Sequence, residues 1–546
     1  MDTSLISLSI SDSFTHVVSE LVKSLKSNPD EFRKMYGVPE PCQSLLLSQY
    51  AKEEGVGDEQ HYFYKRCPEA ISKVLEEIKE LYSIALPLIM TGLLVYGKSA
   101  ISMFFMGRIG KEALAGGSLA ISIANISGYS VISGLAAGME GISSQAFGAN
   151  SWPLMIQTLQ RTIIILIITC IPISLLWLSS ETFFLFWGQN AAISSIATTY
   201  LSYSIPTLLF QSLINPLKIY LRTQKITFPL MLSSALALTI HAPINYFLVY
   251  YLKLGIRAIA LAGALTDLNT LLTLLLYLCF SGIYKRSSCQ PWSLHCCFSE
   301  LKPILCQAIP NCISVCLEWW WYELMIILSG SLTNAAEAVA TMGILIQATA
   351  LVYQFPFALN QAASTRVGNE LGANRPSRAR TSSIVASSCG VLTGLAAMSF
   401  MVTMRNSWGY IFTNDRAIVS LAAAALPIVG LCELGNCPQT TACGVLRGSA
   451  RTTLGACINL GSFYGVGFPV ALLMGFTMDM GLLGLWLGLL AAQIVCVAIM
   501  VVVLITTDWK KQAERARELT GIDMEEDQPE DSTPSDQGLD SDTLHN

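Results

Sequence analysis

The stretch PNCISVCLEWWWYELMIILSG, residues 310–330, places two carboxylates inside an apolar run long enough to span a bilayer. A charged side chain near the bilayer centre costs about 2.5–3.5 kcal/mol on insertion scales, so such acids face a protein interior or a water-filled cavity. At 3.6 residues per turn, one face of this helix carries a polar stripe formed by Asn311, Ser314, Glu318 and Tyr322. Glu323 lies about 140° around the helix from Glu318, so we expect it to contact a neighbouring helix.

The composition is that of a polytopic membrane protein. Of the 546 residues, 52% are hydrophobic and 13% are charged, whereas soluble domains carry about 25% charged residues. The formal net charge is −5, and many of the acids lie in a polar segment at residues 508–546 that we expect to be disordered. That segment argues against a nucleic-acid partner. The 16 cysteines lie mostly in apolar runs, where cysteine behaves as a small hydrophobe, so no disulfide framework is predicted.

Twelve apolar runs satisfy the length needed to cross a bilayer, six on each side of a polar break. The sequence therefore predicts an all-α integral membrane protein. The runs are residues 81–105, 113–137, 158–178, 191–213, 229–250, 256–280, 303–329, 338–360, 382–404, 417–437, 452–475 and 481–505.

These runs predict two six-helix bundles, at residues 76–282 and 303–507, joined by a cytosolic loop at 283–302. Residues 1–75 are predicted to be a partly disordered cytosolic extension, and residues 508–546 a disordered acidic cytosolic tail. One side of the predicted bundle collects 21 Lys and Arg in its short loops and flanks, and the other collects 6. Basic loops face the cytosol, so both termini are predicted to be cytosolic.

The two halves form an internal repeat. Short matches recur in the same order at offsets of 223 to 226 residues, and they are Ala85-Leu86-Pro87 with Ala308-Ile309-Pro310, Gly148-Ala149-Asn150 with Gly372-Ala373-Asn374, Leu221-Arg222 with Leu446-Arg447, and Pro243 with Pro469. Each half has an even number of spans, so the halves share one orientation. A pseudo-two-fold axis along the membrane normal should relate them, with a binding site between them near mid-membrane.

Several segments resemble the signature motifs of multidrug and toxic compound extrusion (MATE) transporters, particularly those of plants. They are GISSQAFGAN (141–150), HAPIN (241–245), LEWWWYE (317–323), RVGNELGAN (366–374), GVLRGSAR (444–451) and GVGFP (465–469). The resemblance covers roughly residues 75–507 and implies secondary antiport of small organic solutes against protons, with coupling acids in the C-terminal half. Glu318 and Glu323 match the seventh-helix carboxylates of the family, and Glu433, in VGLCELGNC, matches its tenth-helix acid.

The first predicted helix departs from bacterial members of the family, which commonly carry an aspartate there. It has no acid and instead carries Lys98, which resembles a plant subgroup placed at the plasma membrane or in endomembranes such as the late endosome, Golgi or vacuole. Lys98 either pairs with an acid or a backbone carbonyl, or attracts an anionic part of the substrate. Asp267 in the sixth span is the candidate partner, because it is the mid-helix acid of this half.

Two motifs suggest chemistry that their context does not support. Residues 92–99, GLLVYGKS, fit the phosphate-loop pattern, but they lie within an apolar helix with no preceding strand, so the glycines are interpreted as helix-packing residues. The cluster of Cys289, His295, Cys296, Cys297 and Cys306 lacks the spacing of a zinc site. No metal, cofactor or enzymatic activity is predicted.

Two further polar residues are interpreted as structural. His241, which precedes Pro243 in the fifth span, is expected to be a buried imidazole hydrogen-bonded to a backbone carbonyl, with proton relay as the alternative. Glu140, near the end of the second span, is expected to order a loop rather than bind solute. For Glu318 and Glu433 the alternative to coupling is a hydrogen-bonded pair that holds helices together.

The first functional hypothesis is a monomeric, proton-coupled antiporter that exports small organic solutes such as xenobiotics, secondary metabolites or hormone-like compounds. The residues assigned to its coupling site and cavity are Glu318, Glu323, Glu433, Asn311, Tyr322, Lys98 and Asp267. A lipid-handling flippase of related fold and a membrane scaffold with vestigial transport are the alternatives. The sequence does not identify the substrate, because such cavities recognise shape, aromatic surface and charge loosely.

Overall fold

The computed structural model describes residues 59–186, 188–283 and 301–521, with side chains from residue 72 onward. Contacts divide the chain into two compact units, Met1–Glu76 and Glu77–Asn546. The described part of the first unit is the start of the helix α4 (Glu59–Ile109), and the remaining helices belong to the second unit. The predictions for residues 1–58, for the loop with Cys289, His295, Cys296 and Cys297, and for residues 522–546 lie outside the described residues.

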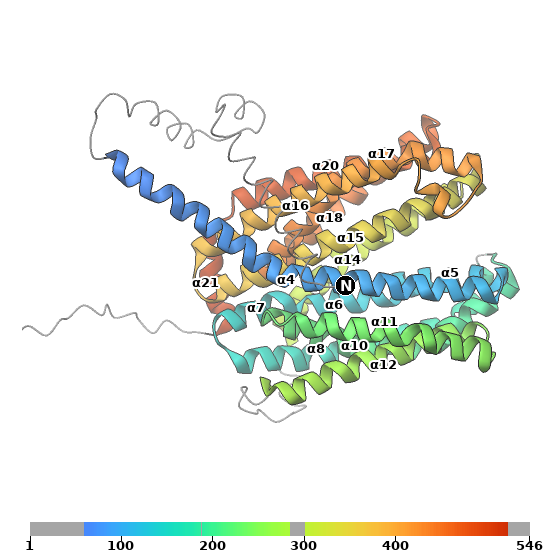
Figure 1. The fold of residues 1–546 in the computed structure, drawn as a ribbon, viewed down its shortest axis with the longest axis horizontal. Helices are drawn as coiled ribbons and strands as arrows, with labels where there is room; N and C mark the ends of the chain where they lie inside the picture. The colour runs from blue at the N-terminus through green and yellow to red at the C-terminus, as the bar shows by residue number, and fades with distance from the viewer. Residues whose placement is uncertain (1–58, 187, 284–300, 522–546) are drawn as a thin grey trace, which may run out of the picture. The chain divides into compact units, whose positions relative to one another are not determined.

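The first half of the helical unit, the N lobe, contains six long helices or helix series (Figure 1). After α4, the second is a series that runs without a loop through α5 (Lys111–Ala124), η3 (Asn125–Tyr129), α6 (Ser130–Ala137) and α7 (Met139–Gly148). The others are α8 (Trp152–Leu178), α10 (Ala191–Thr223), α11 (Phe228–Tyr246) continued by η4 (Phe247–Tyr251), and α12 (Ile256–Ser281), with the short α9 (Ser180–Phe186) between α8 and α10.

The second half, the C lobe, repeats this plan. Its long helices are α14 (Leu301–Ser329), α15 (Ala335–Gly372), α16 (Pro376–Met404), α17 (Arg416–Gly448), the series α18 (Thr452–Asn459), η7 (Leu460–Gly467), α19 (Phe468–Leu472) and η8 (Leu473–Thr477), and α20 (Gly481–Ile505). A 3-10 turn, η6 (Gly409–Ile411), precedes α17, and α21 (Trp509–Thr520) follows α20.

Twelve spans arise from these helices. Within the described residues, eleven helices or helix series are long and apolar enough to cross a membrane. The twelfth, α10, is 33 residues long but rich in serine and threonine, and it packs inside the N lobe against α8 and α12. The prediction of an all-α protein with two six-helix bundles is therefore confirmed, and predicted limits such as 481–505 coincide with the observed helix.

The repeat is visible in the backbone as well as in the sequence. Asn150 and Asn374, Lys225 and Ala450, and Lys253 and Asp479 all have positive φ, and the members of these pairs are 224, 225 and 226 residues apart. Equivalent side chains also cap α10 and α17, because Asn190 and Asp415 each accept a hydrogen bond from the backbone N–H two residues further on. The same turns and caps thus recur at equivalent positions, as a pseudo-two-fold axis requires.

Apolar packing joins the lobes at one end of the bundle. One cluster of buried residues combines Leu81 and Leu221 of the N lobe with Leu359 and Leu371 of the C lobe. Separate clusters fill each lobe further along, around Trp177 in the N lobe and around Trp321 and Trp486 in the C lobe. The ribbons accordingly lie close together at the end that carries α21 and separate toward the other end (Figure 1).

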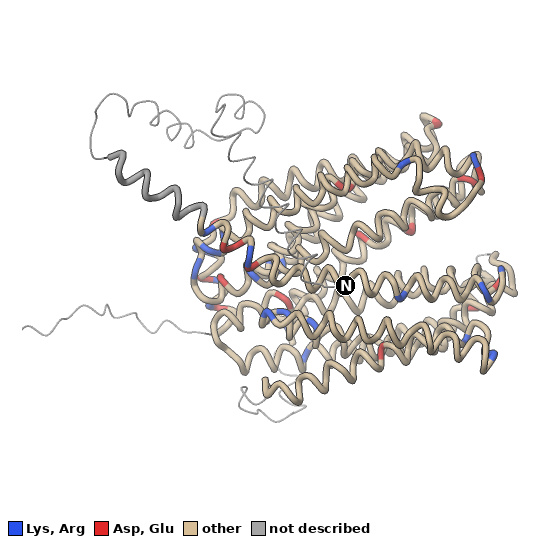
Figure 2. The backbone as a smooth tube through the Cα atoms, viewed as in Figure 1, with Lys and Arg blue, Asp and Glu red and all other residues tan. Residues whose placement is uncertain are grey.

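Charged residues gather at the joined end, near α21 (Figure 2). We call it the basic end, defined by Arg222, Arg366, Arg375 and Arg447. Glu77 accepts two hydrogen bonds from Arg366, at 2.9 and 2.6 Å, and one from Ser382 at 2.7 Å. Because Glu77 lies on α4 and Arg366 on α15, this buried ion pair ties the first helix of the N lobe to the C lobe.

The first part of the acidic tail differs from the prediction of disorder, because residues 509–520 form the helix α21. Asp508 caps it by accepting hydrogen bonds from the backbone N–H groups of Lys510 and Lys511. Trp509, Ala513 and Ala516 form an apolar stripe at i, i+4 and i+7 that is buried against the joined lobes. The prediction missed this short stripe, because small alanines between charged residues contribute little to hydropathy.

Candidate functional site

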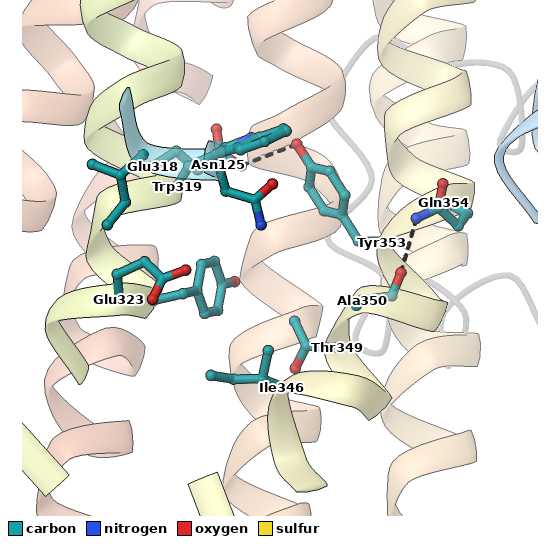
Figure 3. A pocket seen from close by; sticks show the side chains of 11 residues that line it. Asn125, Glu318, Trp319, Glu323, Ile346, Thr349, Ala350, Tyr353 and Gln354 are labelled. Carbon is teal, nitrogen blue, oxygen red and sulfur yellow. Dashed lines mark hydrogen bonds between the residues drawn. The ribbon is translucent and has the colours of Figure 1, made fainter. Parts of the chain in front are cut away.

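Glu318 lies in the middle of α14 and points into the protein. It is 9% exposed, and the Tyr353 hydroxyl of α15 donates a hydrogen bond to its carboxylate at 3.3 Å (Figure 3). Asn311 and Ser314 are buried on the same helix, whereas Trp320 is exposed, so the polar stripe faces inward as predicted. Among the described residues, no cation lies within ion-pair distance of Glu318.

Two neighbouring cavities meet at this carboxylate. The central cavity, of about 400 Å³, is lined by both lobes, and the side cavity, of about 240 Å³, extends from it along α14. Both cavities are lined by Glu318, Trp319, Tyr353 and Gln354. A group bound in either cavity can therefore reach the Glu318 carboxyl.

Tyr322 and Glu323 line the side cavity, together with Asn125 and Ile126 of the N lobe. Figure 3 shows Glu318 and Glu323 on α14 opposite Thr349 and Tyr353 of α15. Glu323 thus meets neighbouring helices, as predicted from its helical angle, and it also borders the cavity that Glu318 borders.

Lys98 and Asp267 form an ion pair in the wall of the central cavity. Lys98 Nζ lies 2.5 Å from Asp267 Oδ1, and the Gln211 amide donates to Oδ2 at 3.1 Å. Both carboxylate oxygens are therefore occupied. Of the two interpretations of Lys98, the structure shows the one in which Lys98 pairs with an acid of its own lobe.

The two other predicted site residues lie away from these cavities. Asn311 donates a hydrogen bond to the carbonyl of Gly134 at 2.7 Å, so it joins α14 to α6 across the lobe boundary. Glu433 on α17 is 1% exposed and accepts a hydrogen bond from Asn436 at 3.0 Å. Neither residue lines the central or the side cavity.

The structure adds cavity residues that the sequence analysis did not assign. On α10, Gln211, Asn215, Lys218 and Arg222 line the central cavity at i, i+4, i+7 and i+11, a spacing that could have revealed them. Arg222 pairs with Glu140 at 2.5 Å and donates to Gln361 of the C lobe. Glu140 is thus the partner of a cavity arginine rather than a residue that orders a loop. Arg447, the repeat equivalent of Arg222, also lines the cavity.

His241 is fully buried, as expected, and it has side-chain partners in addition to a backbone hydrogen bond. Its ring nitrogens contact the hydroxyls of Ser102 at 2.9 Å and Thr266 at 2.8 Å, and the side-chain amide of Asn245 at 3.0 Å. These side chains, together with a backbone hydrogen bond at Ala262, hold the imidazole between α4, α11 and α12. The sequence indicated a buried histidine but did not identify which helices would face it.

A symmetric pair of hydrogen bonds closes the basic end. Gln145 of α7 donates to the carbonyl of Gly448 at 2.9 Å, and Asn369 of α15 donates to the carbonyl of Thr223 at 3.2 Å. The two donors are repeat equivalents, and so are the two acceptors. Each lobe therefore contributes one donor and one acceptor. The two lobes are therefore joined at this end by a matched pair of contacts.

The stretch that fits the phosphate-loop pattern is part of a long helix. Residues 92–99 are helical, and a Cβ added at Gly92 would lie 2.5 Å from Gln354 Oε1, which agrees with helix packing at this glycine. No group of three His, Cys, Asp or Glu side chains suited to a metal ion occurs in the part of the chain that the structure describes.

Comparison with known proteins of similar sequence and fold decides the family. A family model described as MatE matches residues 87–247 and 310–473. The chain belongs to the MATE family. Protein DETOXIFICATION 48 of Arabidopsis thaliana is 52% identical over 463 residues, which cover 84% of this chain and 85% of that protein. Protein DETOXIFICATION 49 of the same plant is 49% identical over 468 residues, with coverages of 86% and 93%.

Solved structures place the fold in the same family. The crystal structure of the eukaryotic MATE transporter AtDTX14 superposes with a TM-score of 0.79 at 31% identity, over 82% of this chain and 100% of that chain. A multidrug resistance MATE transporter in an outward-facing conformation has a TM-score of 0.71 at 15% identity, over 82% and 97%. The predicted resemblance is confirmed, and the chain is a multi-pass membrane transporter of the MATE family.

The Lys98–Asp267 pair should be a stabilising unit. Lys98→Met or Asp267→Asn alone leaves a partner charge unpaired in the membrane-embedded lobe, and we expect each to cost about 3 kcal/mol of unfolding free energy. The double variant should lose less than the two single losses combined, measured by thermal unfolding in detergent. Lys225→Met, which breaks the exposed pair with Glu80, is the control and should cost at most about 1 kcal/mol. Additive losses at Lys98 and Asp267 would show that the pair is not coupled.

Proposed function

We propose that this MATE transporter exports small organic solutes from the cytosol by alternating access, driven by protons that Glu318 exchanges. The observation that carries the proposal is the position of Glu318, because its buried carboxyl is shared by two cavities and has no ion-pair partner among the described residues. A carboxyl in such a place has two states, charged and protonated, whose free energies differ greatly. Exchange of one proton there changes which lobe arrangement is favoured.

The basic end is assigned to the cytosol. The asymmetry of 21 against 6 basic residues at the two ends follows the positive-inside rule. Both termini are then cytosolic, and the host membrane is the plasma membrane or an endomembrane. Because a single chain supplies both lobes and both cavities, we propose that it acts as a monomer.

The arrangement described here is closed on the basic side. The Gln145–Gly448 and Asn369–Thr223 hydrogen bonds, together with the Glu77–Arg366 pair, join the lobes there. Loading solute from the cytosol requires these contacts to separate while the opposite end closes. A ligand shifts this equilibrium only by the difference in its affinity for the two arrangements.

The roles of the other predicted residues follow from their places. Glu433, buried on α17 with Asn436 as its hydrogen-bond donor, would adjust the proton affinity of the site, while Glu323 and Tyr322 would meet solute in the side cavity. The Lys98–Asp267 pair would form the opposite wall of the central cavity. Asn311 would position α14 through its bond to Gly134.

The proton gradient supplies enough free energy for this work. One proton moving down about 100 mV releases roughly 2.3 kcal/mol, and each pH unit adds roughly 1.4 kcal/mol. One pH unit with that potential therefore sustains roughly several-hundred-fold accumulation by one-for-one exchange. No nucleotide site is needed.

Glu318→Gln tests the coupling role directly. Glutamine keeps the size and hydrogen bonding of the protonated acid but cannot lose a proton, so the variant should fold and bind solute yet fail to accumulate it from an imposed pH gradient. Wild type and variant are reconstituted at equal density in sealed vesicles, and uphill substrate movement is measured with the gradient in each direction.

The matched control is Glu337→Gln, the same change at an exposed position at the start of α15. It should leave uphill transport at the wild-type level. If Glu318→Gln accumulates substrate as well as wild type does, Glu318 is a structural acid and coupling must lie at Glu323, Glu433 or Asp267.

The two ends of α16 test the orientation. Arg375, before its first residue, and Arg405, after its last, are both exposed. In a background without reactive native cysteines, a membrane-impermeant thiol reagent applied to the non-cytosolic face should label Arg405→Cys and spare Arg375→Cys, and permeabilised membranes should label both. The reverse pattern would place the basic end outside the cytosol.

A further inference from the structure

The central cavity carries more positive than negative side chains. Its charged lining consists of Lys98, Lys218, Arg222, Arg447, Glu140, Asp267 and Glu318. Four are cations and three are carboxylates. When Glu318 carries a proton, the excess of cations rises from one to two, which is an unusual balance for a cavity within the membrane.

Two of the four cations are already neutralised by partners in the N lobe. Lys98 pairs with Asp267, and Arg222 pairs with Glu140, each at 2.5 Å. Lys218 and Arg447 have no carboxylate within ion-pair distance among the described residues. These two are therefore the cations that a bound solute can neutralise.

Among the described residues, no carboxylate lies within ion-pair distance of Lys218. The charged groups that act on it are Asp267, Lys98 and Arg222. Asp267, the one acid among them, already accepts from Lys98 on one oxygen and from Gln211 on the other. Lys218 thus lines the cavity with no carboxylate at ion-pair distance among the described residues, in a setting where an unpaired charge is costly.

Arg447 has no carboxylate partner among the described residues, because the acid that pairs with its N-lobe equivalent is not repeated in the C lobe. Its equivalent, Arg222, pairs with Glu140, but the residue 224 positions after Glu140 is Ser364. Arg447 is 9% exposed and donates to the side-chain oxygen of Asn360 at 3.3 Å, which occupies one of its five N–H groups. Because Ser364 stands where a second carboxylate would be, the Arg447 guanidinium is available to a ligand.

We propose that the central cavity binds organic acids, with the solute carboxylate held by Lys218 of the N lobe and Arg447 of the C lobe. Trp319 and Phe357, which also line the cavity, would contact an aromatic or alicyclic body. An anion bound to both lobes favours the arrangement in which both cations face one cavity. This assignment of the solute class rests on the proposed export function.

Three probes of one shape but different charge test the assignment, namely naphthoate, naphthamide and naphthylmethylammonium. Their Kd values are measured by calorimetry on the full chain in lipid nanodiscs at neutral pH, without a gradient. Wild type should bind naphthoate about tenfold or more tightly than the neutral amide, and the ammonium most weakly, as expected for charge-assisted hydrogen bonds. Lys218→Gln should abolish the preference for naphthoate while the Kd for the amide stays unchanged.

Lys253→Gln is the matched control, since Lys253 is exposed and lies outside both cavities. It should keep the wild-type preference. The proposal is overturned if wild type prefers the ammonium, or if Lys218→Gln weakens all three probes equally. Because no gradient is applied, a failure of proton coupling at Glu318 would leave the anion preference intact, and loss of the preference would leave the coupling result unchanged.

Discussion

The cost of an unneutralised charge inside a bilayer governs how this protein is organised. Every acidic residue that enters the membrane-spanning part must be paired, hydrogen-bonded or enclosed. Asp267 is paired with Lys98, whereas Glu318 is enclosed with one hydroxyl as its partner. The first arrangement fixes a charge in place, and the second leaves a carboxyl whose charge depends on a proton.

The repeat explains both the scaffold and the asymmetry of the site. Matching turns, caps and the paired Gln145 and Asn369 bonds give the lobes the same frame and a common interface. The charges placed on that frame differ, because Glu140 has Ser364 as its equivalent and Lys218 has Cys443. A symmetric interface allows the two lobes to rotate against each other. The charged residues that line the cavity differ between the lobes, so the lobes differ in the contacts they offer a ligand. In the cavity lining, the Lys98–Asp267 and Arg222–Glu140 pairs lie in the N lobe, whereas Glu318, with no ion-pair partner among the described residues, lies in the C lobe.

Much of the fold followed from hydropathy and from the repeat, since spans such as 256–280 and 481–505 need only a long apolar run. The inward face of Glu318 followed from helical periodicity. Apart from the Lys98–Asp267 pair, pairings between helices did not follow, because periodicity gives the angle of Tyr353 or Lys218 on its own helix and not the rotation of the helix opposite. The helix α21 was missed for a different reason, since its buried stripe consists of one tryptophan and small residues.

The distance between the lobes at the end opposite α21 tests most directly whether the proton on Glu318 sets their arrangement. Spin labels at Tyr251→Cys in the N lobe and Ile411→Cys in the C lobe, both highly exposed, report it in a background without native cysteines. Pulsed electron–electron resonance should give two populations whose ratio follows pH in the otherwise wild-type protein. With Glu318→Gln added, one population should dominate at every pH. A ratio that responds to pH equally with and without Glu318 would contradict the account.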